Sequence, residues 1–533
     1  MDIDCLPFKQ TGYFSELFCD YIDKKEGLSS FYNRFPDLEG FKAQLEEKLV
    51  NYPEGHRTIL YDALQEQYQG ITLSKSTKEH LIQLKEPITF TVVTGHQLNL
   101  FTGPLYFLYK IVSTINLTIA LKKSYPKFNF VPIYWMATED HDFEEINFFN
   151  FKNKKIQWNR DASGPVGRLS TEGLREVYAT FSHELGGGAN AEALKDLFER
   201  AYLQHPTLTE ATRYLANELF GKYGLVIVDG DDKRLKKLLV PYAKKDILEK
   251  VAFNKVSEAN AKLRQMPESY GIQVNPREIN YFYVKDDLRE RIVQRKDIFQ
   301  VYNTDIQFDK EALIKELENH PERFSPNVIS RPLYQEIILP NLCYIGGGGE
   351  LAYWLQLRST FEAMGVAFPI LLPRNSALVL TQKQQQKLDK MNLSVADLFL
   401  SRNQLINKKI REISNIDIDF SPQKEVLKAQ FKDMYDIASQ TDASFLGAVK
   451  AQEVKQLKGL DALENRLLKA QKRKLKDHVE RMTLLQNELF PGQSLQERHL
   501  NFSELYLAYG EGLIPMLIKG LHPLEINFAI LRH

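Results

Sequence analysis

The sequence predicts an α/β fold, in which a doubly wound parallel sheet is interrupted by two insertions and followed by a helical arm. Three observations support this prediction. Short apolar segments alternate with helical patterns, two long gaps separate successive strands, and a late region with few glycines carries a heptad-like apolar repeat. Ligands of such sheets bind beyond the carboxyl ends of the strands, so we expect the functional residues there.

The first half of the core is predicted at residues 88–150, after a mostly helical segment, residues 1–87, that packs on the core. A β-branched and aromatic strand at Thr89–Val93 ends in a turn-forming stretch. A helix follows Gly103-Pro104, because apolar residues recur there at helical spacing and proline is favoured near a first helical turn. This order gives a strand, a glycine-containing loop and a helix.

Four more segments have the composition of buried strands: Asn129–Met136, Leu225–Val228, Asn341–Ile345 and Phe368–Leu372. The third strand begins more than 80 residues after the second ends, and the fourth follows more than 100 residues later. A βαβ crossover needs only a few dozen residues. We therefore expect one insertion at residues 151–222 and a second at about 250–325, within a second half of the core that spans residues 223–375.

Residues 376–490 are predicted to form the helical arm, and we expect residues 491–533 to return to the core. Apolar residues seven positions apart resemble a coiled-coil seam: Leu468, Leu475, Met482 and Leu489. An earlier helical stretch carries a second apolar set: Val426, Phe431, Met434 and Ile437. Two such helices are expected to fold back on each other as an antiparallel pair.

Composition excludes several classes of protein. Lys and Arg together number 69, as do Asp and Glu, so no global charge field attracts nucleic acid or an anionic membrane. Three scattered cysteines, Cys5, Cys19 and Cys343, suit neither a disulfide framework nor a zinc site. No secretory signal or membrane-spanning run is visible. We expect a cytoplasmic protein that recognises its ligands through local charge.

The first candidate site is the loop after the first strand, where Gly95, His96 and Gln97 approach a helix N-terminus beyond Gly103. The N–H groups of such a terminus favour phosphate or carboxylate. His96 can neutralise phosphate or move a proton, and Gln97 can donate and accept hydrogen bonds. The loop lacks the P-loop motif and the dinucleotide spacing, so neither a Walker-type ATPase nor a nicotinamide enzyme is predicted. A purely structural glycine turn is the alternative.

The second candidate site crowds Glu139, Asp140, His141 and Asp142 at the end of the second strand. Such a group can hold an ammonium, coordinate magnesium or contain a general base. A solvated turn with a helix-capping aspartate is the alternative. We assign His96, Asp140, His141 and Asp142 as candidate catalytic residues, and no set of metal ligands.

The third candidate site surrounds the four glycines Gly346–Gly349, which suit close backbone approach to a ligand. Arg331 and Arg374 are candidates for a carboxylate or phosphate clamp, and surface ion pairs are their alternative. Trp354 either stacks on a planar base or belongs to the core. The candidate binding residues are Asn327, Arg331, Gln335, Gly347, Gly348, Glu350, Trp354 and Arg374.

Several long motifs in the same order resemble the bacillithiol biosynthesis cysteine-adding enzyme (BshC) family over essentially the whole chain. The motifs are Thr94–Gln97, Phe101–Tyr106, Trp135–Asp142, Ser325–Glu336, Gly346–Trp354 and Phe490–Arg498. This resemblance implies a Rossmann-like core with two connective-peptide insertions and a C-terminal coiled coil that pairs protomers into a homodimer. It also implies the joining of cysteine to the amine of glucosaminyl-malate.

Forming an amide from a carboxylate in water needs an activated acyl group, so we expect ATP, with Mg²⁺ as a candidate companion. The choice between an adenylate and an acyl phosphate stays open. Class I aminoacyl-tRNA synthetases are a weaker similarity: Gly103-Pro104-Leu105 matches their signature, but Tyr106 and Tyr109 occupy its histidine places. This departure argues against histidine-assisted adenylate formation. Tyr106 is nevertheless assigned as a candidate substrate- or nucleotide-binding residue. A non-catalytic scaffold that binds nucleotide or thiol, and a ligase for another amino acid and small amine, are the alternative functions.

Overall fold

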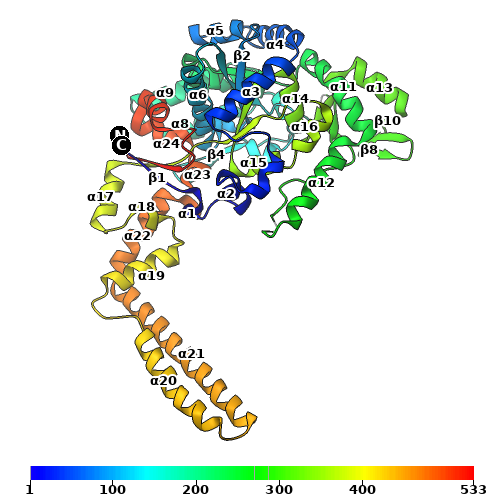
Figure 1. The fold of residues 1–533 in the computed structure, drawn as a ribbon. Helices are drawn as coiled ribbons and strands as arrows, with labels where there is room; N and C mark the ends of the chain where they lie inside the picture. Colours follow the sequence, from blue (N-terminus) through cyan, green and yellow to red (C-terminus); the bar gives the residue numbers. More distant parts are fainter. Residues whose placement is uncertain (1, 269, 286, 533) are drawn as a thin grey trace. The chain divides into compact units, whose positions relative to one another are not determined.

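A five-stranded parallel sheet forms the centre of the larger of two structural units (Figure 1). The computed structural model describes residues 2–268, 270–285 and 287–532. The larger unit consists mainly of residues 13–379 and 496–531, and the smaller unit of residues 380–495. The sheet has the order β13-β12-β2-β3-β6 and contains β2 (Thr89–His96), β3 (Asn129–Met136), β6 (Val226–Asp229), β12 (Asn341–Gly346) and β13 (Ile370–Pro373). The predicted α/β class and all five predicted strands are confirmed.

Helices cover both faces of this sheet, which explains why its strands read as continuous apolar runs. Every residue of β2 is buried. The helix α6 (Tyr106–Ser124) packs on β2 and β3, and α3 (Leu38–Asn51) packs on β12 and β13. Apolar side chains from both helices and from the strands form one core cluster that includes Phe41, Leu117 and Phe130.

The two long gaps between strands are filled by separate substructures. The first contains β4 (Phe148–Phe151), β5 (Lys154–Gln157), α8 (Leu174–Leu185), α9 (Ala189–Tyr202) and α10 (Leu208–Phe220). After α11 (Lys233–Glu249), the second contains α12 (Val251–Gln265), β7 (Tyr281–Lys285), β8 (Leu288–Arg295), β9 (Ile298–Val301), β10 (Gln307–Phe308), α13 (Lys310–Asn319) and β11 (Phe324–Pro326). These strands form an antiparallel sheet of order β10-β9-β8-β7-β11, and α14 (Arg331–Ile338), α15 (Gly348–Trp354) and α16 (Arg358–Met364) follow.

The two ends of the chain meet in a small sheet that sequence patterns did not reveal. Its order is β1-β15-β14, from β1 (Asp2–Leu6), β15 (Phe528–Arg532) and β14 (Ser376–Leu380). The segment before β2 is otherwise helical, with α1 (Phe8–Thr11), α2 (Glu16–Ile22), α3, α4 (Glu54–Gln67) and α5 (Lys75–Gln83). The last segment adds α23 (Gln496–His499), α24 (Phe502–Tyr509) and α25 (Leu513–Gly520), and α25 packs on α6.

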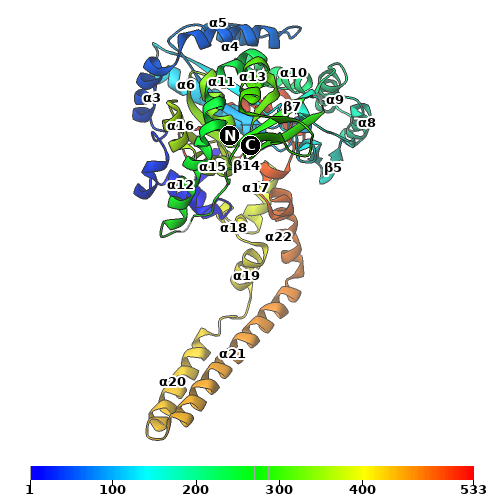
Figure 2. The same cartoon turned by 90° about the vertical axis from the view of Figure 1, so that its right-hand side faces the viewer.

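The smaller unit is helical throughout its long elements, and α20 (Ser421–Ala438) and α21 (Ala443–Lys474) lie antiparallel (Figure 2). The other helices are α17 (Gln382–Lys390), α18 (Val395–Leu398), α19 (Arg402–Ile413) and α22 (Lys476–Leu489). Three of the four predicted seam residues, Leu468, Met482 and Leu489, are buried, but the helix is interrupted at Leu475, between α21 and α22. Of the earlier apolar set, only Phe431 is buried in the α20–α21 contact, while Val426, Met434 and Ile437 are exposed. Within the described residues, we find no helix with the length and apolar character needed to cross a membrane.

Asp246 of α11 is a buried acid that gives the core a pH-dependent stability. Its carboxylate accepts hydrogen bonds from the Ala252 backbone N–H at 2.7 Å and the Ser330 hydroxyl at 3.3 Å. Burial outweighs these bonds and raises the pKa of Asp246 to about 6. Between about pH 4 and 6 the folded state holds this proton while the unfolded state has released it, so the free energy of unfolding falls over this range and the full penalty applies above pH 6.

We predict that Asp246→Asn raises the unfolding temperature at pH 8 and loses this advantage near pH 4. The amide keeps an acceptor oxygen but removes a charge whose burial costs about 3 kcal/mol above pH 6. Thermal unfolding of the variant and the wild type between pH 4 and 8 measures the difference, with the exposed Asp62→Asn as control. An advantage that does not change with pH would contradict this assignment.

Candidate active site at the strand ends

Three cationic side chains, which we call the basic cluster, converge beyond the carboxyl ends of β2, β12 and β13. Lys110 comes from α6, Arg331 begins α14, and Arg374 directly follows β13. The side chains of Lys110 and Arg374 are only 4% and 5% exposed. Charges this deeply buried need specific partners.

Lys110 joins β2 to α15. Its ammonium donates to the carbonyl of Gly95 at 2.7 Å and lies 2.6 Å from Glu350 Oε2. Glu350 also accepts hydrogen bonds from the Tyr344 hydroxyl at 2.7 Å and the Gly347 N–H at 2.9 Å. Burial alone would raise the pKa of the Glu350 carboxyl, but Lys110 and these hydrogen bonds hold it below its ordinary value. The pair is therefore ionised and brings three predicted residues together.

Arg331 lies near the end of β2, beside Gly95 and the Tyr344 hydroxyl. A Cβ at Gly95 would lie 3.3 Å from the Tyr344 hydroxyl and 3.9 Å from Arg331 Nη1. Arg331 Nη1 donates to Gln335 Oε1 at 3.0 Å, while its Nη2 is buried and has no hydrogen-bond partner among the described residues. Gln335 in turn donates to Glu336 at 3.0 Å. Gln335 therefore orients Arg331.

Arg374 also has both paired and unpaired guanidinium nitrogens: two of its three nitrogens have partners among the described residues and the third has none. Its Nη2 lies 2.7 Å from Glu497 Oε1 and its Nη1 donates to Asn375 O at 2.9 Å. Its Nε is buried and lacks a partner in the described part of the chain. The guanidinium lies 5.0 Å from the centre of the Tyr106 ring. Tyr106 thus belongs to the same group.

His96 is buried beside this cluster, with its ring 5.5 Å from that of Tyr106. Burial, then Lys110 and Arg374, lower its pKa well below the ordinary value, so the imidazole is neutral. Its neighbour Gln97 donates to Asp140 Oδ2 and to Glu145 Oε2, both at 2.9 Å. Gln97 therefore connects the first candidate site to the second.

The residues Asp140–Asp142 form a partly exposed group next to Gln97. Asp140 accepts hydrogen bonds from Gln97 and from the His141 N–H, and although burial opposes it, hydrogen bonds from His141 and Gln97 lower its pKa to about 2. Arg289 of the second insertion places Nη1 2.6 Å from His141 Nδ1. Because a guanidinium only donates, Nδ1 is the acceptor and the ring proton is on Nε2.

This group does not fit a magnesium ion as it is arranged. Asp140, His141 and Asp142 place one ligand atom each within 4.8 Å of one another. However, the Arg289 cation already contacts His141 Nδ1, and both Asp140 oxygens accept hydrogen bonds. Magnesium prefers oxygen ligands in an octahedral arrangement. An open hollow of about 440 Å³ lies beside the group, and its lining includes one cation, Arg160, and four carboxylates: Asp142, Glu144, Glu145 and Asp161. This excess of negative charge suits an ammonium.

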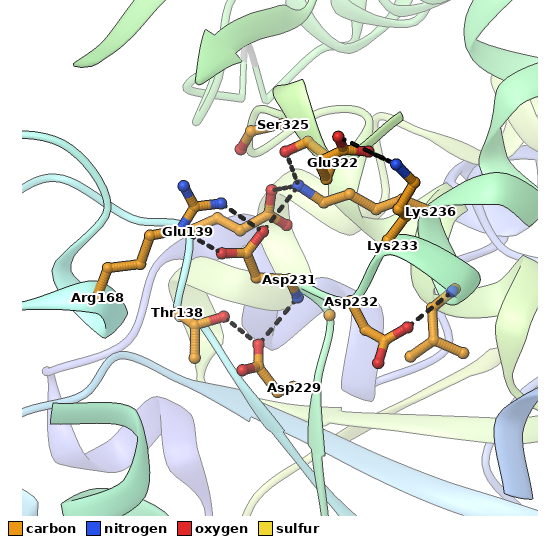
Figure 3. Close-up of polar contacts among 12 residues, drawn as sticks. Thr138, Glu139, Arg168, Asp229, Asp231, Asp232, Lys233, Lys236, Glu322 and Ser325 are labelled. Carbon is orange, nitrogen blue, oxygen red and sulfur yellow. Dashed lines mark hydrogen bonds and ion pairs between the residues drawn. The ribbon is translucent and has the colours of Figure 1, made fainter. Parts of the chain in front are cut away.

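A buried charge network holds the loop that carries these residues (Figure 3). Lys236 Nζ lies 2.6 Å from Glu139 and 3.1 Å from Asp231, and it donates to the Glu322 carbonyl at 3.3 Å. Arg168 binds Asp231 with two hydrogen bonds, at 2.8 and 3.1 Å. Arg168 belongs to the first insertion and Glu322 to the second. The network therefore connects both insertions to the loop before Asp140.

Four residues that the sequence analysis assigned to the site instead contact other parts of the fold. Gly103 has a φ of +64°, and a Cβ there would meet the Asn99 Cβ at 2.6 Å. The Asn327 amide bonds to Asn280 and to the N–H groups of the turn before α14. Gly348 packs on phenylalanine rings. Trp354 is fully buried and stacks on Tyr344 at 4.4 Å, so it is a core residue and no platform for a base.

Three site residues escaped the sequence analysis: Lys110, Arg289 and Glu497. The sequence offered a sign of two of them. Lys110 is a charged residue within an otherwise apolar helical segment, and Glu497 lies in the Phe490–Arg498 motif. Arg289 had none, since its contact with His141 depends on how the second insertion folds back over the strand ends.

Comparison with known proteins gives matches over the whole chain. A family model described as the N-terminal Rossmann-like domain of bacillithiol biosynthesis BshC matches residues 1–375, and one described as its C-terminal coiled-coil domain matches residues 377–533. The chain is 59% identical to a protein of Christiangramia forsetii, with 100% of this chain and 99% of the relative covered. Proteins of Flavobacterium johnsoniae and Flavobacterium psychrophilum are 57% and 54% identical, with full coverage of both chains. All three relatives carry the name "Putative cysteine ligase BshC".

Proposed function

The chain belongs to the BshC family of bacillithiol biosynthesis, and from this premise we propose that it is an ATP-dependent cysteine ligase that adds cysteine to the amine of glucosaminyl-malate. The names of its relatives support the cysteine substrate and the ligase class. The need to activate a carboxylate in water supports ATP, and magnesium enters the proposal as the ion that accompanies the nucleotide phosphates.

One observation carries the placement of the reaction. Arg331 Nη2 and Arg374 Nε are buried N–H donors without a hydrogen-bond partner among the described residues, although the Tyr353 hydroxyl interacts with the Arg331 guanidinium. An unpaired buried donor costs about 1–3 kcal/mol, and more when it is charged, so each of these donors favours an anionic oxygen as its partner. A cysteine carboxylate or an ATP phosphate supplies such an oxygen. The basic cluster is therefore proposed as the place where the carboxylate is activated.

The negatively charged part of the site lies on the other side of Gln97 from the basic cluster. Carboxylates outnumber cations among the described residues that line the hollow beside His141, four to the single Arg160, and the Asp142 side chain is 55% exposed. We assign this hollow to the ammonium of cysteine and to the approach of the sugar amine. The amine nitrogen forms a bond to the activated acyl carbon, the bond to the phosphate-bearing oxygen breaks, and an exposed carboxylate of the hollow takes the released proton.

Purified protein incubated with cysteine, glucosaminyl-malate, ATP and magnesium is expected to form bacillithiol, measured by mass spectrometry. Arg331→Met should lower kcat/KM by about 100-fold, because it removes a charge-assisted hydrogen bond to the reacting anion. Arg295→Met, which removes an exposed arginine of the second insertion, is the matched control and should retain activity. No product from the wild type across a range of pH and metal conditions would contradict the proposal.

The alternative functions give different results. If His141→Ala and Asp142→Asn leave cellular bacillithiol intact while deletion of residues 382–489 abolishes it, the protein is a scaffold of the pathway. An untargeted comparison of metabolites with and without the gene detects a ligase for another amino acid or amine. We place the reaction in the cytoplasm, where reducing conditions suit the free cysteines Cys5, Cys19 and Cys343.

The arm is proposed to join two copies of the chain into a homodimer. Its helices expose several large apolar side chains: Val426, Met434, Ile437, Phe445, Leu446, Val454 and Leu463. A stretch of this kind along two helices suits a partner helix. Light scattering should therefore give twice the 61.7-kDa mass of one chain.

The double variant Val426→Lys and Ile437→Lys is expected to shift the mass to that of one chain, because lysine resists burial in a helix contact. Ile119→Lys, which changes an exposed isoleucine of α6, is the control and should leave the mass unchanged. A wild type with the mass of one chain, or a double variant that keeps twice that mass, would exclude this interface.

A further inference from the structure

A small cavity lies behind His96, on the side of the first insertion. It is bounded by the end of β2, by Tyr134 of β3 and by Thr212 of α10. Its volume is about 10 Å³, which is room for the centre of one water-sized group. The reaction proposed above assigns no role to this cavity.

Five polar atoms around this cavity are buried without a hydrogen-bond partner in the described part of the chain. They are His96 Nε2, Asn99 Oδ1, Thr102 Oγ1, Tyr134 Oη and Thr212 Oγ1. None of these five side chains is more than 8% exposed. Buried polar groups of native proteins are almost always satisfied, so five around one cavity indicate a group that binds there.

We propose that this cavity is the subsite for the side chain of the amino-acid substrate, and that it takes the neutral thiol of cysteine. The inference rests on the proposed function, because that function makes cysteine the substrate. It adds the residues that would select cysteine among amino acids.

The charges around the cavity favour a neutral donor. Lys110 and Arg374 act on His96 and disfavour a second cation beside it. His96 Nε2 and Asn99 Oδ1 present lone pairs, which disfavour an anion. Burial raises the pKa of Tyr134, so its hydroxyl keeps its proton. A thiol S–H donates to His96 Nε2, and the sulfur accepts from the Tyr134 hydroxyl.

Size and wall composition favour a thiol over other neutral side chains. The cavity holds one heavy atom, so longer or branched side chains do not fit. Phe107, Leu215 and Ala216 complete its walls. These apolar walls can pack against a thiol, which behaves as a small apolar group with a weak S–H donor.

The position of the cavity fits the rest of the proposed substrate. Gln97 lines the cavity and also donates to Asp140, next to the hollow assigned to the ammonium. On the other side, the Tyr106 ring lies 5.5 Å from His96 and 5.0 Å from the Arg374 guanidinium. The cavity therefore lies beside residues that contact both the acidic group and the basic cluster.

The experiment compares cysteine, serine and alanine on full-length protein, by calorimetric binding and by competition in the ATP-dependent reaction. The wild type should prefer cysteine over alanine by about 10- to 100-fold, the range that one buried group provides. Ala216→Val fills the cavity and should reduce this preference at least about 10-fold, with unchanged affinity for ATP. Thr212→Val, nearly isosteric, should reduce it less, and Glu218→Gln on the exposed side of α10 should not change it.

The outcomes separate the two proposals. If both cavity variants make product with the wild-type preference, the subsite is wrong while the ligase activity stands. Equal binding of serine and cysteine, or a crystal structure with cysteine bound elsewhere and only water in the cavity, also overturns the subsite. A wild type that neither binds cysteine nor forms product overturns the proposed function itself. If Ala216→Val fails to fold, Thr212→Val decides the question.

Discussion

The ion pair between the buried Lys110 and the partly exposed Glu350 is the interaction on which the strand-end site depends. It joins α6 to α15 beyond the sheet, and its partners include the carbonyl of Gly95 and the N–H of Gly347. Removing one member of such a pair leaves a buried charge and costs about 3–5 kcal/mol. A Cβ at Gly95 would crowd the Tyr344 hydroxyl at 3.3 Å, while a Cβ at Gly347 would make only ordinary contacts with Glu350 and Arg374.

The two insertions complete a site that the sheet alone would leave unfinished. The first contributes Thr212 to the cavity and Arg168 to the network around Lys236, while the second contributes Arg289 to His141. The core strands position His96, Gln97 and Arg374. In this account the core provides the basic cluster, and the insertions define the amino-acid end of the site, which explains why long segments interrupt the sheet at these two places.

Much of the fold was predictable, because its main signals are local. Asn129–Met136 is a continuous apolar run and forms a strand with those same bounds. The small sheet of β1, β14 and β15 was not predictable, since its strands come from distant parts of the chain. The heptad spacing predicted a helix through Leu475, which instead separates two helices. Within the site, Arg331 and Arg374 were recognised by type, but their partners Gln335 and Glu497 depend on tertiary packing, and Trp354 proved to be a core residue.

The most direct test of the central claim follows the oxygen atoms of the cysteine carboxylate. In a reaction with cysteine labelled at both carboxylate oxygens with oxygen-18, ATP-dependent activation transfers one labelled oxygen to the phosphorus product. We predict label in AMP if an adenylate forms, or in inorganic phosphate if an acyl phosphate forms, in amounts equal to the bacillithiol produced. Bacillithiol formed without label in either product would show that ATP does not activate the carboxylate, and would contradict the account.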